Sequence, residues 1–259
     1  MADQLFSVSD QIVVVSGGSR GIGLAIAVGF AERGAQVIVT GRQPDTLREV
    51  EREFQHVGRI RGVVCDVSQT SDLQAMVDNV LAQEGRIDTL VNVAGVNRRK
   101  PSTSLTREDY DYVMNINLTG AYELSVMVAR DMIARGSGCQ INVTSLNNDR
   151  PLKNVAPYAM SKAALGQMTR ALALEWSDRG VRVNGLAPGF ILTDLTHKLW
   201  SDPKMLEWGI ANTPQRRLGV PQDLVGTAIF LAAPASAFMT GQILYVDGGF
   251  TAGWNWPIP

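Results

Sequence analysis

Tyr158 and Lys162 lie four residues apart in the second half of the chain, and Ser145 precedes them. This spacing predicts that the tyrosine and the lysine project from one face of a helix, one turn apart. A tyrosine with an ordinary pKa of about 10 stays protonated at neutral pH, and a neighbouring ammonium favours its ionised form. The three side chains therefore indicate proton exchange with a substrate hydroxyl or carbonyl group, whose oxygen the serine can hydrogen-bond.

A glycine-rich turn, Ser-Gly-Gly-Ser-Arg-Gly-Ile-Gly, occupies residues 16–23, between an apolar run and a helical pattern that reaches Arg33. Glycine lets the backbone turn tightly and approach a pyrophosphate, whose charge then lies at the helix N-terminus. Its spacing, Gly-x-x-x-Gly-x-Gly, differs from the best-known dinucleotide fingerprint, Gly-x-Gly-x-x-Gly. The turn predicts a dinucleotide site with contacts from Gly17, Ser19, Arg20, Gly21, Ile22 and Gly23.

Short apolar runs rich in β-branched residues alternate with helical patterns along the chain. They predict strands over residues 12–15, 36–40, 60–65, 89–91, 140–143, 182–187 and 243–246. Continuous apolar runs are typical of strands buried on both faces. The expected fold class is α/β, a doubly wound, predominantly parallel sheet of the Rossmann type in a single domain, residues 1–259. Residues 190–220 are expected to form an insertion that serves as a substrate loop.

The composition is ordinary for a soluble globular protein, with 45% hydrophobic and 19% charged residues among 259. A net charge of −1 predicts no nucleic-acid partner and no attraction to anionic membranes. The chain begins with no basic-then-apolar leader, and no apolar run reaches the roughly 18 residues of a membrane span, so a cytoplasmic protein is expected. Cys65 and Cys139 lack Cys-x-x-Cys spacing and a histidine cluster, which predicts buried thiols and no metal site.

The chain resembles the short-chain dehydrogenase/reductase family. The resemblance rests on the glycine turn, on Ser145 with the Tyr-x-x-x-Lys pair, and on Asn-Val-Ala-Gly at residues 92–95, and it spans nearly the whole chain. Val93 departs from the family, which more often has a second Asn there, at a position that caps a strand end. The resemblance implies a dehydrogenase whose catalytic residues are Asn117, Ser145, Tyr158 and Lys162.

The end of the second predicted strand bears on the choice between NADP and NAD. Gly41 occupies the position where NAD-preferring relatives usually place an Asp for the ribose 2′-hydroxyl, and Arg42 follows it. Arg20 in the glycine turn is a second cation for a 2′-phosphate, and no carboxylate follows before Asp45. Either arginine alone could be a solvated surface charge. Together they favour NADP over NAD.

The resemblance implies further cofactor contacts at three strand ends and at the catalytic pair. Asp66 lies where the family contacts the adenine, although it could equally cap the helix expected from about Thr70. The fourth strand end, the catalytic pair and the Pro-Gly loop after the sixth strand contribute the others. With Asp66, this set comprises Val67, Asn92, Ala94, Gly95, Tyr158, Lys162, Pro188, Gly189, Ile191 and Thr193.

The loops expected above the reactive end of the cofactor are polar, which suits a hydroxyl-rich or anionic small-molecule substrate better than a steroid or an acyl chain. The Arg98-Arg99 pair is similar to the gluconate 5-dehydrogenases and related sugar-acid dehydrogenases of the family, where an arginine could bind a carboxylate. Either arginine could also be solvated. The candidate substrate residues are Arg98, Arg99, Asn147 and His197.

Two other functions remain open. A 3-oxoacyl-[acyl-carrier-protein] reductase would share every motif named above, and Arg130 could belong to its docking patch. Leu174, however, stands where those reductases often have a second arginine. A non-catalytic, cofactor-sensing protein could have the same fold, because the fold alone does not determine the function. The intact set of catalytic residues argues against it.

The last residues of the chain, 253–259, contain Trp254 and Trp256. Two tryptophans at a polar chain end would be poorly solvated, so the tail is expected to pack on a neighbouring subunit. Members of the family are commonly tetramers, and a homotetramer is therefore expected.

Overall fold

Seven strands form one parallel sheet in the computed structural model, which describes residues 4–253. The strand order is β3-β2-β1-β4-β5-β6-β7. Every strand predicted from the sequence is confirmed, with small shifts at the ends, and the sheet is parallel throughout. The bounds are β1 Ile12–Ser16, β2 Gln36–Gly41, β3 Ile60–Val64, β4 Thr89–Asn92, β5 Gly138–Val143, β6 Val181–Pro188 and β7 Ile243–Val246.

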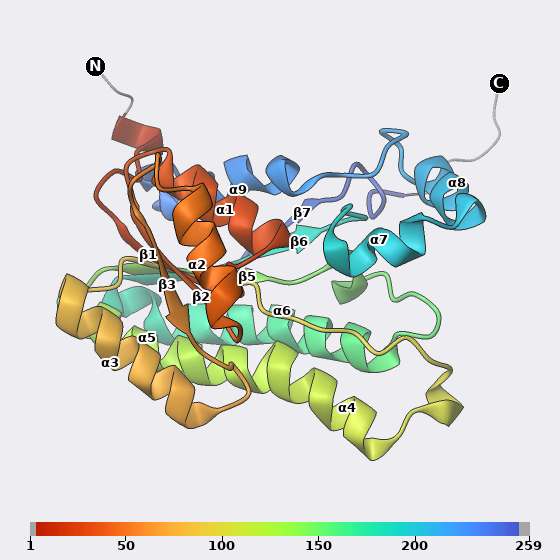
Figure 1. The fold of residues 1–259 in the computed structure, drawn as a ribbon, viewed down its shortest axis with the longest axis horizontal. Coiled ribbons are helices and arrows are strands. Elements are labelled where there is room, and N and C mark those ends of the chain that lie inside the picture. The colour runs from red at the N-terminus through yellow and green to blue at the C-terminus, as the bar shows by residue number, and fades with distance from the viewer. Residues whose placement is uncertain (1–3, 254–259) are drawn as a thin grey trace.

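Helices cover both faces of this sheet, as the doubly wound prediction requires (Figure 1). One face carries α1 (Gly21–Ala31), α2 (Pro44–Glu53) and α9 (Val225–Ala232). The opposite face carries α3 (Thr70–Glu84), α5 (Gly120–Arg135) and α6 (Ala156–Trp176). The remaining helices are α4 (Arg107–Met114), which leads into α5, and α7 (Asp194–Trp200) and α8 (Pro203–Asn212), which pack on each other.

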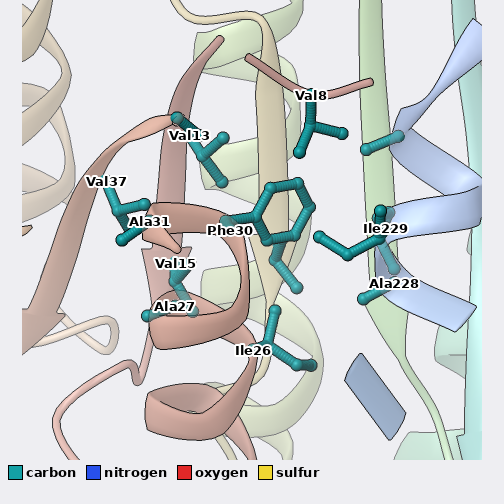
Figure 2. Close-up of a cluster of buried hydrophobic side chains, with 14 of the residues drawn as sticks. Val8, Val13, Val15, Ile26, Ala27, Phe30, Ala31, Val37, Ala228 and Ile229 are labelled. Carbon is teal, nitrogen blue, oxygen red and sulfur yellow. The ribbon is translucent and has the colours of Figure 1, made fainter. Parts of the chain in front are cut away.

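Alternate side chains of each strand fill the two layers between sheet and helices. In β1, Val13 and Val15 face α1 and α9, whereas Val14 faces the layer of α3 and α5. Figure 2 shows the first layer, where the ring of Phe30 lies between the strand side chains and Ile229 of α9. Both faces of the strand are thus apolar, which explains its continuous apolar sequence.

The chain reverses its direction of winding between β1 and β4. From β1 the chain proceeds outward to β2 and β3, then returns to pair β4 on the other side of β1. The carbonyl oxygen of Ser16 accepts hydrogen bonds from the N–H groups of both Val93 and Ala94, at 3.0 and 2.9 Å. These bonds hold the β1 and β4 loops side by side at the carboxyl ends of the strands, where ligands bind in open α/β sheets.

The segment over residues 190–220 contains α7 and α8 and closes one end of the molecule (Figure 1). Its aromatic side chains cluster with Phe250: the ring of Phe190 lies 5.3 Å from that of Trp200 and 4.8 Å from that of Phe250, centroid to centroid. Leu146, the residue after Ser145, is buried in the same cluster. The segment therefore packs directly behind the loop that carries a predicted catalytic side chain.

Both cysteines are free and buried, and burial raises the pKa of Cys65 to about 12. No group of three or more metal-binding side chains occurs among the described residues. None of the helices between residues 4 and 253 combines the length and the hydropathy of a membrane span. The tryptophan pair of the tail lies outside the described residues.

Candidate active site

The glycine turn leaves no room for a side chain at Gly17 or Gly23. Gly17 has a φ of +77°, and a Cβ there would lie 2.8 Å from backbone atoms of Ala94. A Cβ on Gly23 would lie 2.2 Å from the carbonyl oxygen of Gly17. No side chain caps α1, so the N–H groups of its first turn lack the partner that a capping residue would give. A close backbone approach and an uncapped helix N-terminus are what a pyrophosphate site needs.

A cavity of about 640 Å³, called the cofactor cavity below, opens beside this turn. Arg20 and Arg42 both reach its wall, and neither pairs with a carboxylate within the part of the chain that the structure describes. The glycine backbone and these two guanidinium groups fit a dinucleotide that carries an additional phosphate. The predicted contacts in its lining are Gly17, Ser19, Arg20, Gly21, Ile22, Gly23, Arg42, Asp66, Val67, Ala94, Gly95 and Thr193.

Asp66 lies in the wall of the cavity and does not cap α3, whose N-cap residue is Gln69. Its carboxylate accepts hydrogen bonds from the backbone N–H and the hydroxyl of Ser68. Burial raises the pKa of Asp66, but these bonds and the charge of Arg42 outweigh it and lower the pKa below the ordinary value. The carboxylate is therefore ionised and can accept further hydrogen bonds from a ligand in the cavity.

Several predicted cofactor contacts lie outside the lining of the cofactor cavity. Asn92 is buried beneath it and donates from Nδ2 to Ser125 and Asn142, both at 2.9 Å. Gly189 packs against β7, since a Cβ there would lie 2.5 Å from the Cα of Asp247. The full set outside the lining is Asn92, Tyr158, Lys162, Pro188, Gly189 and Ile191.

Lys162 is buried in α6, and its Nζ donates to the carbonyl oxygen of Val143 at the end of β5, at 2.7 Å. Burial lowers the pKa of this amine to about 8. The Nζ lies 5.9 Å from the ring centroid of Tyr158, one helical turn earlier. A Cβ on Gly95 would lie 3.6 Å from the same Nζ. The β4 loop and the β5 end thus enclose a positive charge next to the tyrosine.

Tyr158 is half-buried, and its pKa is raised above the ordinary value by burial. A hydrogen bond with Ser145 and the charge of Arg99 act in the opposite direction. Ser145 is buried directly after β5 and opens the short helical turn Leu146–Asn148. The structure therefore brings three residues predicted to be catalytic, Ser145, Tyr158 and Lys162, into one group.

Asn117 lies in a π-helical turn, Asn115–Thr119, that joins α4 to α5. Its side chain binds the β4 loop twice, accepting from the N–H of Val96 at 2.8 Å and donating to the Val96 carbonyl at 2.9 Å. It also donates to the hydroxyl of Ser161, beside Lys162. The insertion of one residue into the helix, a common feature of functional sites, places the amide between the loop and α6.

The structure separates the four candidate substrate residues. The guanidinium of Arg98 lies 3.5 Å from the Asp109 carboxylate and 4.3 Å from the ring centroid of Tyr112. Arg99 is exposed, forms no ion pair with any described carboxylate, and acts electrostatically on Tyr158. His197 is exposed on α7, whereas Asn147 is buried against Ser145.

Other residues of the cofactor cavity were not predicted from the sequence. Val96, Asp194 and Leu195 directly follow predicted contacts, so extending each motif by one or two residues would have found them. Ile116 reaches the wall from the π-helical turn. No sequence pattern predicts the π-helical turn Asn115–Thr119.

Comparison with known proteins supports one family. Residues 17–251 match the family model described as "Enoyl-(Acyl carrier protein) reductase". The chain is 39% identical over 251 residues to a gluconate 5-dehydrogenase of Gluconobacter oxydans, covering 95% of this chain and 97% of that protein. The chain belongs to the short-chain dehydrogenase/reductase family. The matched region of this short-chain dehydrogenase/reductase contains both the glycine turn and the serine, tyrosine and lysine group.

Two further relatives of this short-chain dehydrogenase/reductase share its length. A 5-keto-D-gluconate 5-reductase of Escherichia coli is 34% identical over 249 residues, covering 95% of this chain and 98% of that protein. A crystal structure of a gluconate 5-dehydrogenase from Burkholderia cenocepacia, in complex with NADP and tartrate, is 37% identical. It superposes with a TM-score of 0.94 over 97% of this chain and 99% of its own. The whole fold is therefore shared.

The burial of Lys162 predicts how stability responds to Lys162→Met. A pKa lowered from 10.5 to about 8 means that burying the charged amine costs about 3 kcal/mol at pH 7, partly offset by the bond to Val143. We expect the variant to be at least as stable as the wild type at pH 7 by chemical denaturation, with turnover lost. Between pH about 8 and 10.5 the folded enzyme has released this proton and the unfolded chain has not, so the wild type gains relative stability there. A variant clearly less stable than the wild type at pH 7 would contradict the claim that burial of the charged Lys162 amine destabilises the folded enzyme.

Proposed function

We propose that this chain is an NADP-dependent oxidoreductase that interconverts a secondary alcohol and a ketone on a sugar acid or polyol, as a gluconate 5-dehydrogenase does. The observation that carries the proposal is the grouping of Ser145, Tyr158 and the buried Lys162 ammonium beside a cavity built for a dinucleotide. The relatives named for gluconate and 5-keto-D-gluconate cover the chain from end to end and support the sugar-acid substrate.

Each residue of the site has a separate role in the proposed reaction. Bound NADP would supply the hydride acceptor, and NADPH the hydride donor. In reduction, Tyr158 donates its proton to the substrate oxygen while Ser145 donates a hydrogen bond to the same oxygen. In oxidation, the tyrosinate takes the hydroxyl proton, and the Lys162 ammonium stabilises that anion. Asn117 holds the β4 loop against the lysine through its two bonds to Val96.

The preference for NADP follows from the charges around the cofactor cavity. Arg20 and Arg42 supply two guanidinium groups, which bind phosphate through paired hydrogen bonds. Gly41 at the end of β2 has no side chain, so this strand end carries no carboxylate for a ribose hydroxyl. The NADP complex of the Burkholderia relative supports the same cofactor here.

Of the two neighbouring arginines, Arg99 is the better candidate for a substrate carboxylate. Its charge acts on Tyr158, and it has no carboxylate partner among residues 4–253. Arg98 is already engaged by Asp109 and stacked on Tyr112, so its role is to hold the loop. The segment over residues 190–220 would close over the substrate from the other side, with His197 exposed on α7.

A 3-oxoacyl-[acyl-carrier-protein] reductase is the second candidate. Arg130 is exposed on α5, but Leu174 on α6 is an exposed apolar side chain where a second docking arginine would stand. Exposed apolar residues on these two helices, Tyr122, Met160 and Leu174, instead support a contact between subunits, as in a cytoplasmic homotetramer.

A substrate panel tests the proposed function. Gluconate, 5-keto-D-gluconate, neutral polyols and acetoacetyl thioesters are assayed by the absorbance of NADPH and NADH. The proposal requires turnover of a sugar acid with a preference for NADPH. Turnover of thioesters alone would establish the second candidate, and no turnover of any carbonyl with either cofactor would favour a binding protein.

Arg42→Asp should move the cofactor preference from NADP toward NAD. The new carboxylate repels a 2′-phosphate and can accept hydrogen bonds from a 2′-hydroxyl. The ratio of kcat/KM for NADPH over NADH should fall by at least about tenfold, since one charge-assisted bond is worth roughly 1.5–3 kcal/mol. Arg52→Asp makes the same change of charge at an exposed position on α2 outside the lining of the cofactor cavity, and is the matched control. A wild type that already prefers NADH would refute this assignment.

Arg99→Ala should raise KM for a sugar acid by about tenfold to a hundredfold, because it removes charge-assisted hydrogen bonds worth roughly 1.5–3 kcal/mol each. The same variant should change KM little for the matching neutral polyol. Arg98→Ala serves as the control: it loosens the loop without removing the proposed carboxylate ligand, so it should change the KM for the acid and for the polyol by similar factors. Equal effects of Arg99→Ala on the KM for the acid and for the polyol, or no effect on either, would show that Arg99 is a solvated surface charge that does not bind the substrate carboxylate.

A further inference from the structure

The hydroxyl of Ser145 accepts two hydrogen bonds from the same neighbour, Asn147. The backbone N–H of Asn147 lies 3.1 Å from Ser145 Oγ, and the side-chain Nδ2 lies 3.3 Å from it. The other end of the Asn147 amide, Oδ1, accepts from the backbone N–H of Leu152 at 3.0 Å. Because a backbone N–H can only donate, this bond identifies the oxygen end of the amide and turns its NH₂ group toward the serine.

A serine hydroxyl has one O–H donor and two acceptor lone pairs. At Ser145 both lone pairs face groups that can only donate. The O–H group is therefore left to make the remaining hydrogen bond, as a donor. It is directed to Tyr158, where the hydrogen bond from Ser145 partly offsets the rise in pKa that burial causes. The serine is therefore a donor before any substrate is bound.

We propose that Asn147 is a positioning residue that fixes Ser145 as a hydrogen-bond donor to the substrate oxygen. The inference rests on the proposed function, in which a ketone oxygen and an alcohol oxygen occupy the same place. A ketone oxygen has only lone pairs and needs two donors, which Ser145 and Tyr158 provide. An alcohol oxygen gives its proton to the tyrosinate and accepts from Ser145. A donor-only serine thus binds the oxygen in both directions.

The surroundings of Asn147 hold it in this arrangement. It is 6% exposed in the turn Leu146–Asn148, and Leu146 is anchored in the aromatic cluster behind it. The next residue, Asn148, donates to the hydroxyl of Tyr245 on β7 at 3.2 Å. Groups locked by packing and hydrogen bonding are the ones that can preorganise a neighbour.

Asn147→Asp tests the proposal with almost no change in shape. The carboxylate still accepts from Leu152, but it presents an acceptor to Ser145, whose hydroxyl then turns away from the substrate. We expect kcat to fall about a hundredfold, toward the value of Ser145→Ala, as when one oxyanion donor is removed. The KM and the Kd of NADPH should stay within about twofold, because the lost hydrogen bond acts mainly on the charge that develops on the oxygen in the transition state, and no cofactor contact changes. In a Ser145→Ala background the second substitution should cost nothing more.

A titration of Tyr158 separates this proposal from the proposed function, since it needs no turnover. Ultraviolet absorbance of the free protein, with Tyr158→Phe as reference, should give a higher tyrosine pKa in Asn147→Asp than in the wild type, and no further rise in the Ser145→Ala background. A rise that persists without Ser145 would show direct charge repulsion and overturn the proposal.

Asn147→Ala guards against a folding defect in the aspartate variant. It keeps the backbone N–H donor to Ser145 and loses only the amide, so its kcat should lie between the wild type and Asn147→Asp. A structural role alone would instead lower the thermal midpoint and NADPH affinity, with losses that add to those of Ser145→Ala. That outcome, or wild-type kcat in Asn147→Asp, would overturn the proposal.

Discussion

The ammonium of Lys162 is buried between α6 and the end of β5, where the carbonyl oxygen of Val143 accepts its hydrogen bond at 2.7 Å. A charge in such a place is unfavourable, and burial accordingly lowers the pKa of the amine to about 8. The rest of the site depends on it. The lysine is one turn from Tyr158, it lies under the β4 loop at Gly95, and Asn117 holds that loop from the other side. Three segments distant in sequence are thus gathered around one charge.

The doubly wound sheet makes this gathering possible. Parallel strands end at the same edge, so the loops after β1, β4 and β5 meet there, and the bonds from Val93 and Ala94 to Ser16 keep the first two in register. The aromatic cluster under α7 and α8 supports the same edge from outside, because it contains Leu146, next to Ser145. The segment proposed to close over the substrate and the support for the serine therefore share one set of side chains.

The strands and the glycine turn could be predicted from the sequence. Burial on both faces requires continuous apolar residues in a strand, and a close backbone approach requires glycine in the turn. The sequence predicted Ser145, Tyr158 and Lys162 as a group through spacing and family resemblance, and the structure brings them together. It could not distinguish Arg98 from Arg99, since the partners Asp109 and Tyr112 come from α4, on another part of the chain. Nor could it show that Asn147 faces Ser145, because that orientation depends on the backbone of Leu152.

The most direct test of the account is the Tyr158→Phe variant, which removes one hydroxyl and leaves the aromatic ring. Turnover is measured by NADPH absorbance with the best sugar acid or ketone, and cofactor affinity by fluorescence titration of NADPH on the same protein. If Tyr158 exchanges the proton with the substrate, turnover falls by at least roughly a hundredfold, the smallest usual contribution of a general acid or base, with NADPH affinity nearly unchanged. Turnover close to that of the wild type, with the cofactor bound normally, would contradict this role of Tyr158.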